Sequence, residues 1–352
     1  MTDLRLDSHK LIFHPEAVSN YLKTGDTYPL EIEVSPSGAC NHRCVFCSMD
    51  YLGYKPEFLD ADVLLTVLRF LAGKGLKSVV FAGEGEPLLN KDLGRMASET
   101  KKVGIDIAMS TNGALMTRDY IDNYLHLFSW IRFSIAGIKQ ETYSKIQRAK
   151  AGDLEKALGS LKMCAEFKKE NNFGVTLGVQ CLLLDSNKDE LVEMAQALRT
   201  IGADYFTIKP YIVPGQSNNK LEVSYEYAEK LKMDIQKEAT ESFSIYFRTD
   251  AIRRLETKKT YAVCHGMPFF VYIDSKGNVC VCVQYIGDSD FNYGNIYEQS
   301  FEEIWEGEKR RQIEERLSGE YLHKNCRKAC RLDVMNNYLH ELKHPGEHVN
   351  FI

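Results

Sequence analysis

The chain alternates between short apolar runs and longer amphipathic stretches up to about residue 210. The apolar or alternating runs predict strands at 28–34, 77–81, 106–109, 130–135, 174–184 and 205–208. The stretches between them have helical periodicity, as at 154–168 and 188–200, and Asp60 is placed to cap another helix that begins after it. Strands that alternate with helices predict an α/β fold with a parallel sheet and right-handed crossovers. Six βα units are too few to close an eight-stranded barrel, so we expect a partial (β/α)6 TIM-like barrel rather than an open doubly wound sheet.

The pattern changes near residue 240. From Ser244 the chain has short strands and hairpins, with a turn at 274–277, then a helix over 301–317 and another from about Leu332. We therefore expect three segments: a lead-in at 1–27, the partial barrel at 28–240 and a small C-terminal α+β domain at 241–352.

Charge and hydropathy exclude some classes of partner. The net charge of -5 and the scattered basic residues give no reason to expect a nucleic-acid partner. The first twenty residues lack the apolar core of a signal peptide, and no window approaches the roughly 18 apolar residues of a membrane span. We expect a cytoplasmic protein with no membrane partner.

Ten cysteines in such a chain are poorly explained by disulfides, because a reducing cytosol keeps thiols free. Cys40, Cys44 and Cys47 are separated by three and two residues, directly after a predicted strand. Thiolates in a tight loop select iron–sulfur clusters, zinc or copper(I). A structural zinc site needs four ligands, whereas three cysteines on a [4Fe–4S] cluster leave one iron open. The alternatives are a zinc site with His42 as fourth ligand, or buried thiols.

This CxxxCxxC motif, with Phe46 as the aromatic residue before the last cysteine, resembles the radical S-adenosylmethionine (SAM) superfamily. The resemblance extends over about residues 28–215. It implies that the open iron chelates SAM and that one electron cleaves SAM to methionine and a 5′-deoxyadenosyl radical. That radical then removes a hydrogen atom from the substrate, which no side chain can do.

Further motifs stand where this superfamily contacts SAM. Residues 82–87 (AGEGEP) match its GGEP loop, although Glu84 replaces the first glycine, and residues 110–113 (STNG) follow the third strand. Each motif by itself is also compatible with an ordinary turn. Arg148, in a later loop, could pair with the SAM carboxylate or be an ordinary solvated arginine. The resemblance implies SAM contacts from Phe46, Glu84, Gly85, Glu86, Thr111, Asn112, Ser134 and Arg148.

A second group of cysteines lies in the C-terminal segment. Cys264 and Cys282 form the spacing C-x12-G-x4-C, and Cys326 and Cys330 follow. With the later stretch 294–305 (GNIYEQSFEEIW), this spacing resembles the SPASM or shorter twitch extension of radical SAM enzymes. The region lacks the further cysteines of a full SPASM domain, so one auxiliary [4Fe–4S] cluster fits best and should pass electrons. A structural zinc site on the same four cysteines is the alternative.

Three cysteines and one lysine remain. Cys164 fits a helical apolar pattern and is expected in the core. Cys181, which could face the barrel interior, and Cys280, which lies beside a cluster ligand, are candidate hydrogen-atom donors, with a structural role as the alternative. Lys209 interrupts the apolar end of a strand and could bind phosphate or carboxylate, or act as a base; a solvated lysine is the alternative. We expect Gln180, Lys209 and Tyr211 to line the substrate cavity.

These features predict a radical SAM oxidoreductase of the dehydrogenase or epimerase type. Radical SAM enzymes with one auxiliary cluster include some that oxidise a secondary alcohol of a sugar-like substrate, and only residues 1–27 precede the first strand here. We therefore expect a small-molecule substrate, a carbohydrate or nucleotide-linked sugar, and an external one-electron reductant of the flavodoxin or ferredoxin type. The alternatives are a peptide or protein maturase and, more remotely, a non-catalytic iron–sulfur electron-transfer protein.

Overall fold

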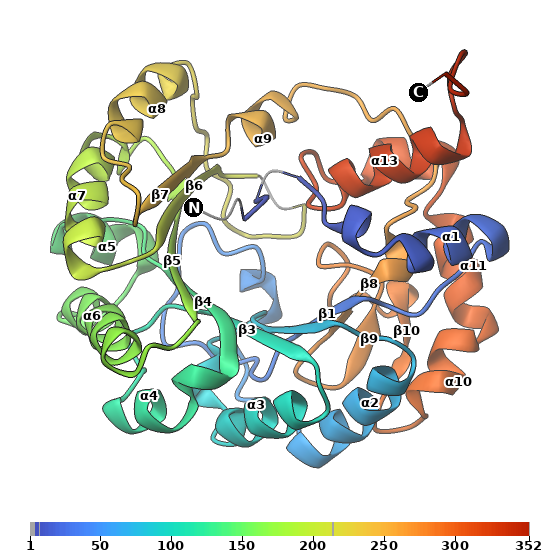
Figure 1. Cartoon of the computed structure of the whole chain (residues 1–352), viewed down its shortest axis with the longest axis horizontal. Coiled ribbons are helices and arrows are strands. Elements are labelled where there is room, and N and C mark those ends of the chain that lie inside the picture. Colours follow the sequence, from blue (N-terminus) through green and yellow to red (C-terminus); the bar gives the residue numbers. More distant parts are fainter. Residues whose placement is uncertain (1–3, 7, 213–214, 352) are drawn as a thin grey trace.

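The computed structural model describes residues 4–6, 8–212 and 215–351, and its strands form one curved sheet (Figure 1). The sheet order is β10-β9-β8-β1-β2-β3-β4-β5-β6-β7. The first seven strands are parallel neighbours in chain order. Their bounds are Glu31–Val34 (β1), Ser78–Phe81 (β2), Asp106–Thr111 (β3), Phe128–Ser134 (β4), Thr176–Leu183 (β5), Tyr205–Pro210 (β6) and Ser244–Phe247 (β7). The partial barrel is confirmed, with a seventh parallel strand after the six predicted ones.

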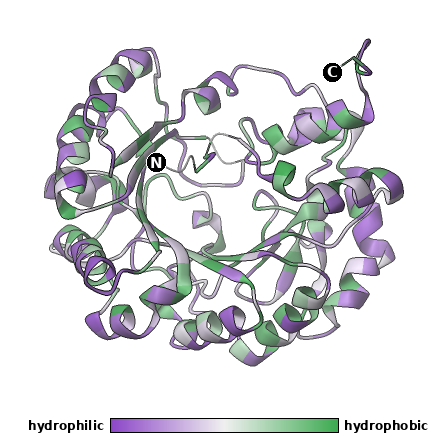
Figure 2. Cartoon of the chain, viewed as in Figure 1, coloured by the Kyte–Doolittle hydropathy of each residue, from purple (hydrophilic) through white to green (hydrophobic). Residues whose placement is uncertain are grey.

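Helices cover the outer face of this sheet (Figure 1). They are α2 (Ala61–Gly73), α3 (Leu93–Lys102), α4 (Arg118–Tyr124), α5 (Gln140–Gln147), α6 (Asp153–Asn171), α7 (Leu191–Ile201), α8 (Ala228–Gln236) and α9 (Thr249–Arg253). Asp60 caps α2 as predicted, because its carboxylate accepts hydrogen bonds from the backbone N of Asp62 and Val63. Hydrophobic and hydrophilic stretches alternate along these helices, as expected when one face packs on the sheet (Figure 2).

Short 3-10 helices interrupt the connecting loops. They are η1 (Leu11–Phe13), η2 (Asp50–Leu52), η3 (Pro87–Leu89), η4 (Leu125–Leu127), η5 (Lys188–Glu190), η6 (Met267–Phe269) and η7 (Ser289–Phe291).

Side chains alternate between the two faces of each strand. In β1, Ile32 and Val34 are fully buried in the core under the helices, whereas Glu31 and Glu33 point to the concave face. The same alternation places Lys209 of β6 on the concave face, because its neighbour Ile208 lies in the core. The concave face is therefore the polar one.

The C-terminal segment continues the barrel sheet. Strand β8 (Phe270–Ile273) runs parallel to β1, and β9 (Asn278–Cys280) and β10 (Asn292–Asn295) follow antiparallel. The turn predicted at 274–277 joins β8 to β9, with Gly277 in the left-handed region (φ 82°). The division of the chain at residue 240 stays a prediction, since strands from both sides of it share one sheet.

Four helices complete the C-terminal segment: α10 (Phe301–Glu306), α11 (Glu308–Arg316), α12 (Gly319–Asn325) and α13 (Asp333–Lys343). The helix predicted over 301–317 is thus wrong as one element. Gly307 takes an extended backbone (ψ 152°) between α10 and α11, and glycine is costly inside a helix. The helix predicted from about Leu332 is confirmed, with Leu332 as the residue before its first turn.

The two ends of the chain pack together. Helix α1 (Pro15–Thr24) lies against α13, and the contact buries Val18, Tyr21 and Leu339 with Phe269. No helix in the described part of the chain is long and apolar enough to cross a membrane.

Candidate functional site

The loop that follows β1 carries the first three cysteines. The Sγ of Cys40 accepts a hydrogen bond from the backbone N of His42 (3.4 Å), and the backbone N of Cys47 donates to the carbonyl of Cys44 (3.1 Å). Burial raises the pKa of Cys44 well above its usual value, and the charges of Cys47 and Cys40 raise it further. A metal centre binds these sulfurs as thiolates, which burial disfavours. The positive charge of the centre itself therefore has to stabilise them.

His42 points away from these sulfurs. Its Nε2 lies 3.3 Å from Oδ2 of Asp153 and its Nδ1 lies 3.3 Å from Nε2 of Gln147, and the ring is buried. Both ring nitrogens are therefore engaged with α5 and α6. The zinc alternative with His42 as fourth ligand has no support in this arrangement.

The cysteine loop is tied to the end of α5. The backbone N of Arg43 donates to the carbonyl of Gln147 (3.1 Å), and that of Val45 donates to the carbonyl of Ile146 (2.8 Å). Arg148 ends α5 in the left-handed region (φ 45°), and its side chain is exposed. Its positive charge lowers the pKa of Cys44 and so partly offsets the effect of burial. This position beside the cysteines suits an arginine that binds a carboxylate.

The 82–87 loop packs directly on the cysteine loop. The backbone N of Glu86 donates to the carbonyl of Ala39 (2.8 Å). A Cβ on Gly85 would lie 2.0 Å from that same carbonyl oxygen, so only glycine fits. This close approach is the physical reason for a glycine at position 85.

Glu86 acts as a framework residue rather than an exposed contact. Its carboxylate is buried and accepts hydrogen bonds from Oγ1 of Thr111 (2.5 Å) and the backbone N of Asn112 (2.8 Å). The amide of Asn112 donates in turn to Oδ1 of Asn41 in the cysteine loop (2.7 Å). Three predicted SAM contacts, Glu86, Thr111 and Asn112, thus join the β2 and β3 loops to the cysteine loop. Burial raises the pKa of Glu86 to about 7.

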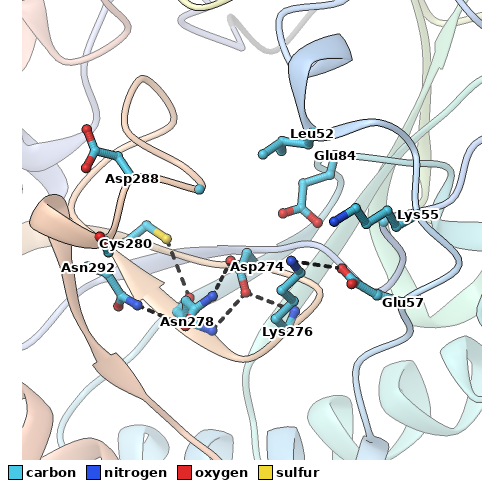
Figure 3. Close-up of a pocket in the computed structure, with 13 residues that line it drawn as sticks. Leu52, Lys55, Glu57, Glu84, Asp274, Lys276, Asn278, Cys280, Asp288 and Asn292 are labelled. Atoms are coloured by element: carbon cyan, nitrogen blue, oxygen red, sulfur yellow. Dashed lines mark hydrogen bonds and ion pairs between the residues drawn. The ribbon is translucent and has the colours of Figure 1, made fainter.

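The Glu84 side chain points elsewhere, into a cavity of about 210 Å³ between the cysteine loop and the β8–β9 hairpin (Figure 3). Its Oε2 accepts hydrogen bonds from Oγ of Ser35 (3.4 Å) and the backbone N of Ser275 (3.3 Å). Lys55 and Cys280 line the same cavity. The side chain therefore links barrel and hairpin, and only the backbone of Glu84 is left for the predicted SAM contact.

Phe46 and Ser134 lie on the other side of the cysteine loop. Phe46 packs against a buried group that includes Ile146 and Tyr211. The carbonyl of Ser134, at the end of β4, accepts a hydrogen bond from Nε2 of Gln147 (3.2 Å). Gln147 thus holds the β4 end and His42 together, a role that no feature of the sequence pattern signalled.

The four C-terminal cysteines line one cavity: Cys264, Cys282, Cys326 and Cys330. Asn336 of α13 donates from Nδ2 to the Sγ of Cys264 (3.4 Å). Burial is the main cause that raises the pKa of Cys282 to about 11. Among the described residues, no three His, Cys, Asp or Glu side chains surround a point that could hold a single metal ion. Four thiolates around one cavity suit a cluster that binds each sulfur through a different iron.

The prediction that Cys181 could face the barrel interior is wrong. Cys181 is buried in the core between the sheet and the helices, next to Asn187, whose amide lies 3.3 Å from its Sγ. Strand alternation is the reason, because Gln180 and Leu182 take the concave side. Cys164 lies in the core as predicted.

Cys280 lies on β9, close to the loop that carries the first group of cysteines. It is buried in a cluster with Met49 and Tyr272, and Cys47 of the first group packs against this cluster. It also stands two residues before Cys282 of the second group. Cys280 is thus near the first group through this cluster and near the second group along the chain.

Lys209 lies on the concave face near the carboxyl end of β6. Within the described residues it makes no hydrogen bond or ion pair, and its side chain is half-buried. Burial lowers its pKa well below the usual value, and Arg132 adds to the effect. Tyr211 is instead engaged, because its hydroxyl donates to the carbonyl of Asn219 (2.9 Å).

The two cysteine groups fall within two family matches. The Radical SAM superfamily profile matches residues 34–198, and that of SPASM, an iron–sulfur cluster-binding domain, matches residues 264–331. The chain belongs to the radical SAM superfamily. The radical SAM domain binds SAM and a [4Fe–4S] cluster, and the SPASM domain binds auxiliary iron–sulfur clusters. The three thiols beside Arg148 and the four thiols around one cavity are donor sets that fit these clusters.

Curated relatives of this radical SAM protein differ in name. It is 30% identical over 189 residues to an S-adenosylmethionine-dependent nucleotide dehydratase of Lacinutrix mariniflava, covering 52% of this chain and 39% of the relative. It is 25% identical over 296 residues to an AdoMet-dependent heme synthase of Methanosarcina barkeri, covering 77% and 80%. The chain thus spans about two fifths of the dehydratase.

Solved structures share the fold of this radical SAM protein. Streptococcus suis SuiB bound to its precursor peptide SuiA superposes with a TM-score of 0.67 at 17% identity, covering 86% of this chain and 71% of SuiB. Native anSMEcpe with bound AdoMet superposes with a TM-score of 0.62 at 17% identity, covering 90% and 95%. At these identities the likeness shows the fold alone.

Proposed function

We propose that this protein removes a hydrogen atom from a small substrate inside the barrel and so oxidises or epimerises a carbinol C–H of a carbohydrate or nucleotide-linked sugar. Cys40, Cys44 and Cys47 would hold the SAM-binding cluster, and Cys264, Cys282, Cys326 and Cys330 one auxiliary cluster. Bound SAM would supply the hydrogen-abstracting radical, and the auxiliary cluster would exchange electrons. The similarity to a protein named a nucleotide dehydratase supports a nucleotide-linked substrate.

The observation that carries this proposal is Lys209 on the concave face at the carboxyl end of β6, where (β/α) barrels place their active sites. A lysine without a partner can bind an anionic substituent of the substrate. With its pKa lowered by burial and Arg132, its amine can instead accept the proton that leaves a carbinol during oxidation.

The role of Cys280 would distinguish epimerisation from oxidation. Epimerisation needs a hydrogen-atom donor for the substrate radical, and Cys280 is the candidate because it lines the cavity into which Glu84 points, next to the loop after β1. Oxidation needs a proton acceptor, for which Lys209 is the candidate. Cys181, buried behind the strand, provides a matched cysteine that should take no part.

The test combines SAM cleavage with product analysis. Anaerobically reconstituted protein is given SAM, dithionite and candidate sugar nucleotides in deuterated solvent, and 5′-deoxyadenosine and products are measured. Solvent deuterium in the product that is lost in Cys280→Ser but kept in Cys181→Ser supports epimerisation. A two-electron-oxidised product whose formation falls in Lys209→Met supports oxidation.

Two outcomes contradict the proposal. Stoichiometric zinc without 5′-deoxyadenosine excludes the radical chemistry. Turnover of a short peptide, with none of any sugar substrate, shows that the protein is a peptide maturase.

A further inference from the structure

A groove of about 580 Å³ lies between the segment at 254–261, the loop at 326–329 and the start of α13. Asp333 is the one acidic residue among the described residues that line it, and its carboxylate is already engaged. It lies 2.7 Å from Nζ of Lys259 and accepts a hydrogen bond from the hydroxyl of Tyr261. The basic residues that line this groove, here called the basic groove, are Arg254, Lys258, Lys259, His323 and Lys328.

Most of this positive charge is not neutralised locally. Lys258 and Lys328 are exposed, and neither forms an ion pair with any described residue. Arg254 has a buried Nε that finds no hydrogen-bond partner within residues 4–6, 8–212 and 215–351. The segment that carries these charges is held to α13, because Oγ1 of Thr260 lies 3.0 Å from Oδ1 of Asn337. The basic groove is therefore a defined cationic site on a protein whose net charge is -5.

The basic groove meets the auxiliary cysteines at Cys326. This residue lines the groove, and it also lines the cavity that Cys264, Cys282 and Cys330 share. No other described residue lines both spaces. Cys326 is only partly buried. A cluster held by the four cysteines would therefore have one ligand at the wall of a cationic surface groove.

We propose that the basic groove is the docking site of an acidic one-electron carrier protein of the flavodoxin type, which exchanges electrons with the auxiliary cluster beside Cys326. The step transfers one electron and no atom: the cluster gains the electron that the reduced carrier loses, and the reverse transfer reoxidises the cluster. This inference rests on the proposed function, in which the auxiliary cluster exchanges electrons, and adds the surface at which the external partner binds.

The distribution of charge favours a protein partner over a small anion. Lys258 and Lys328 carry flexible, exposed ammonium groups on two separate segments of the chain. Such groups attract an acidic surface over a long range and speed its association. A small anion instead needs several donors fixed at hydrogen-bonding distance, a role for which the planar group of arginine is better suited.

The test measures electron transfer from a reduced acidic flavodoxin to anaerobically reconstituted enzyme by stopped-flow absorbance. Lys258→Gln/Lys328→Gln is compared with Lys169→Gln/Lys309→Gln, which makes the same charge change at two exposed lysines outside the groove. At low ionic strength we expect the second-order rate to fall about tenfold in the groove variant and less than about twofold in the control. The wild-type rate should also fall more steeply with added salt than that of the groove variant.

Two further measurements show that the clusters are loaded and which one receives the electron. Iron content should match in both lysine variants, and dithionite, which needs no docking surface, should reduce their clusters to the same final extent. The variant Cys40→Ala/Cys44→Ala/Cys47→Ala can keep only the auxiliary cluster. We expect flavodoxin to reduce this cluster at the wild-type rate, seen in the electron paramagnetic resonance spectrum of the reduced cluster.

Three results overturn the inference. Equal flavodoxin rates in the two lysine variants exclude the groove as the docking site. No reduction of the auxiliary cluster in the triple cysteine variant means that the carrier delivers its electron elsewhere. Pyrophosphate binding that is lost only in Lys258→Gln/Lys328→Gln, with an unchanged flavodoxin rate, makes the groove a site for small anions.

Failure of the proposed function is a separate outcome. Charge-dependent electron transfer from flavodoxin without turnover of any sugar nucleotide would reject the proposed function and keep the docking site. Turnover of a sugar nucleotide with dithionite, together with flavodoxin rates that ignore the groove charges, would reject the docking site and keep the proposed function.

Discussion

The buried carboxyl of Glu86 connects three loops of the candidate site. It receives hydrogen bonds from Thr111 and Asn112, and Asn112 reaches Asn41 in the cysteine loop. In Glu86→Gln the new amide group would face a backbone N–H in either orientation, that of Asn112 or that of Leu88, donor against donor. We expect a loss of about 1–3 kcal/mol in the free energy of unfolding, measured by denaturant titration. The surface variant Glu99→Gln should cost little; equal losses in both variants would contradict this role.

The same carboxyl predicts a pH dependence. Burial raises the pKa of Glu86 in the folded protein to about 7 from an ordinary value of 4.5. Its contribution to stability is therefore fully present below about pH 4.5 and is lost as the pH rises through about 7. The melting temperature, measured at several pH values across this window, should fall more steeply with pH for the wild type than for Glu86→Gln. The same dependence of melting temperature on pH in both proteins would show that Glu86 does not titrate between about pH 4.5 and 7.

Gly85 is required by a steric contact. A methyl group at this position would meet the carbonyl oxygen of Ala39 at 2.0 Å. Gly85→Ala should push the 82–87 loop off the cysteine loop, cost about 1–3 kcal/mol of stability, and lower 5′-deoxyadenosine formation about tenfold. Gly159→Ala, in open space on α6, is the control and should leave both unchanged or slightly raise stability. Wild-type activity in Gly85→Ala would refute the contact.

At the scale of elements, the helix start of α13 and the β8–β9 hairpin bring the auxiliary cysteines to one cavity. The double variant Cys326→Ala/Cys330→Ala should lose about four of about eight irons and keep 5′-deoxyadenosine formation, because the other three cysteines stay intact. Cys164→Ser, in the core beside Met116, should keep all the iron. Loss of all iron in the double variant would mean that the two centres do not assemble independently.

At the scale of the whole molecule, the contact between α1 and α13 joins the two ends of the chain. Leu339 is fully buried there with Val18 and Tyr21, so Leu339→Ala should lower the free energy of unfolding by about 2–5 kcal/mol and reduce the melting temperature. Leu342, on the same helix but 42% exposed, gives a control, and Leu342→Ala should change stability by less than about 0.5 kcal/mol. Similar melting temperatures for both variants would show that the ends of the chain fold separately from the barrel.

The sequence by itself determined the features that depend on neighbours along the chain. The periodicity of apolar residues predicted β1 to β6, the cap at Asp60 and the turn before Gly277, because these follow from local backbone and side-chain geometry. The cysteine spacings likewise indicated two metal centres before any fold was known.

Only the tertiary structure decided the contacts between distant segments. It paired β8 with β1, placed Cys181 in the core and gave Glu86 its hydrogen-bond partners. The physical reason is that strand order, the facing of each strand and the pairing of buried charges depend on packing across the whole sheet. A pattern of neighbouring residues contains none of that information.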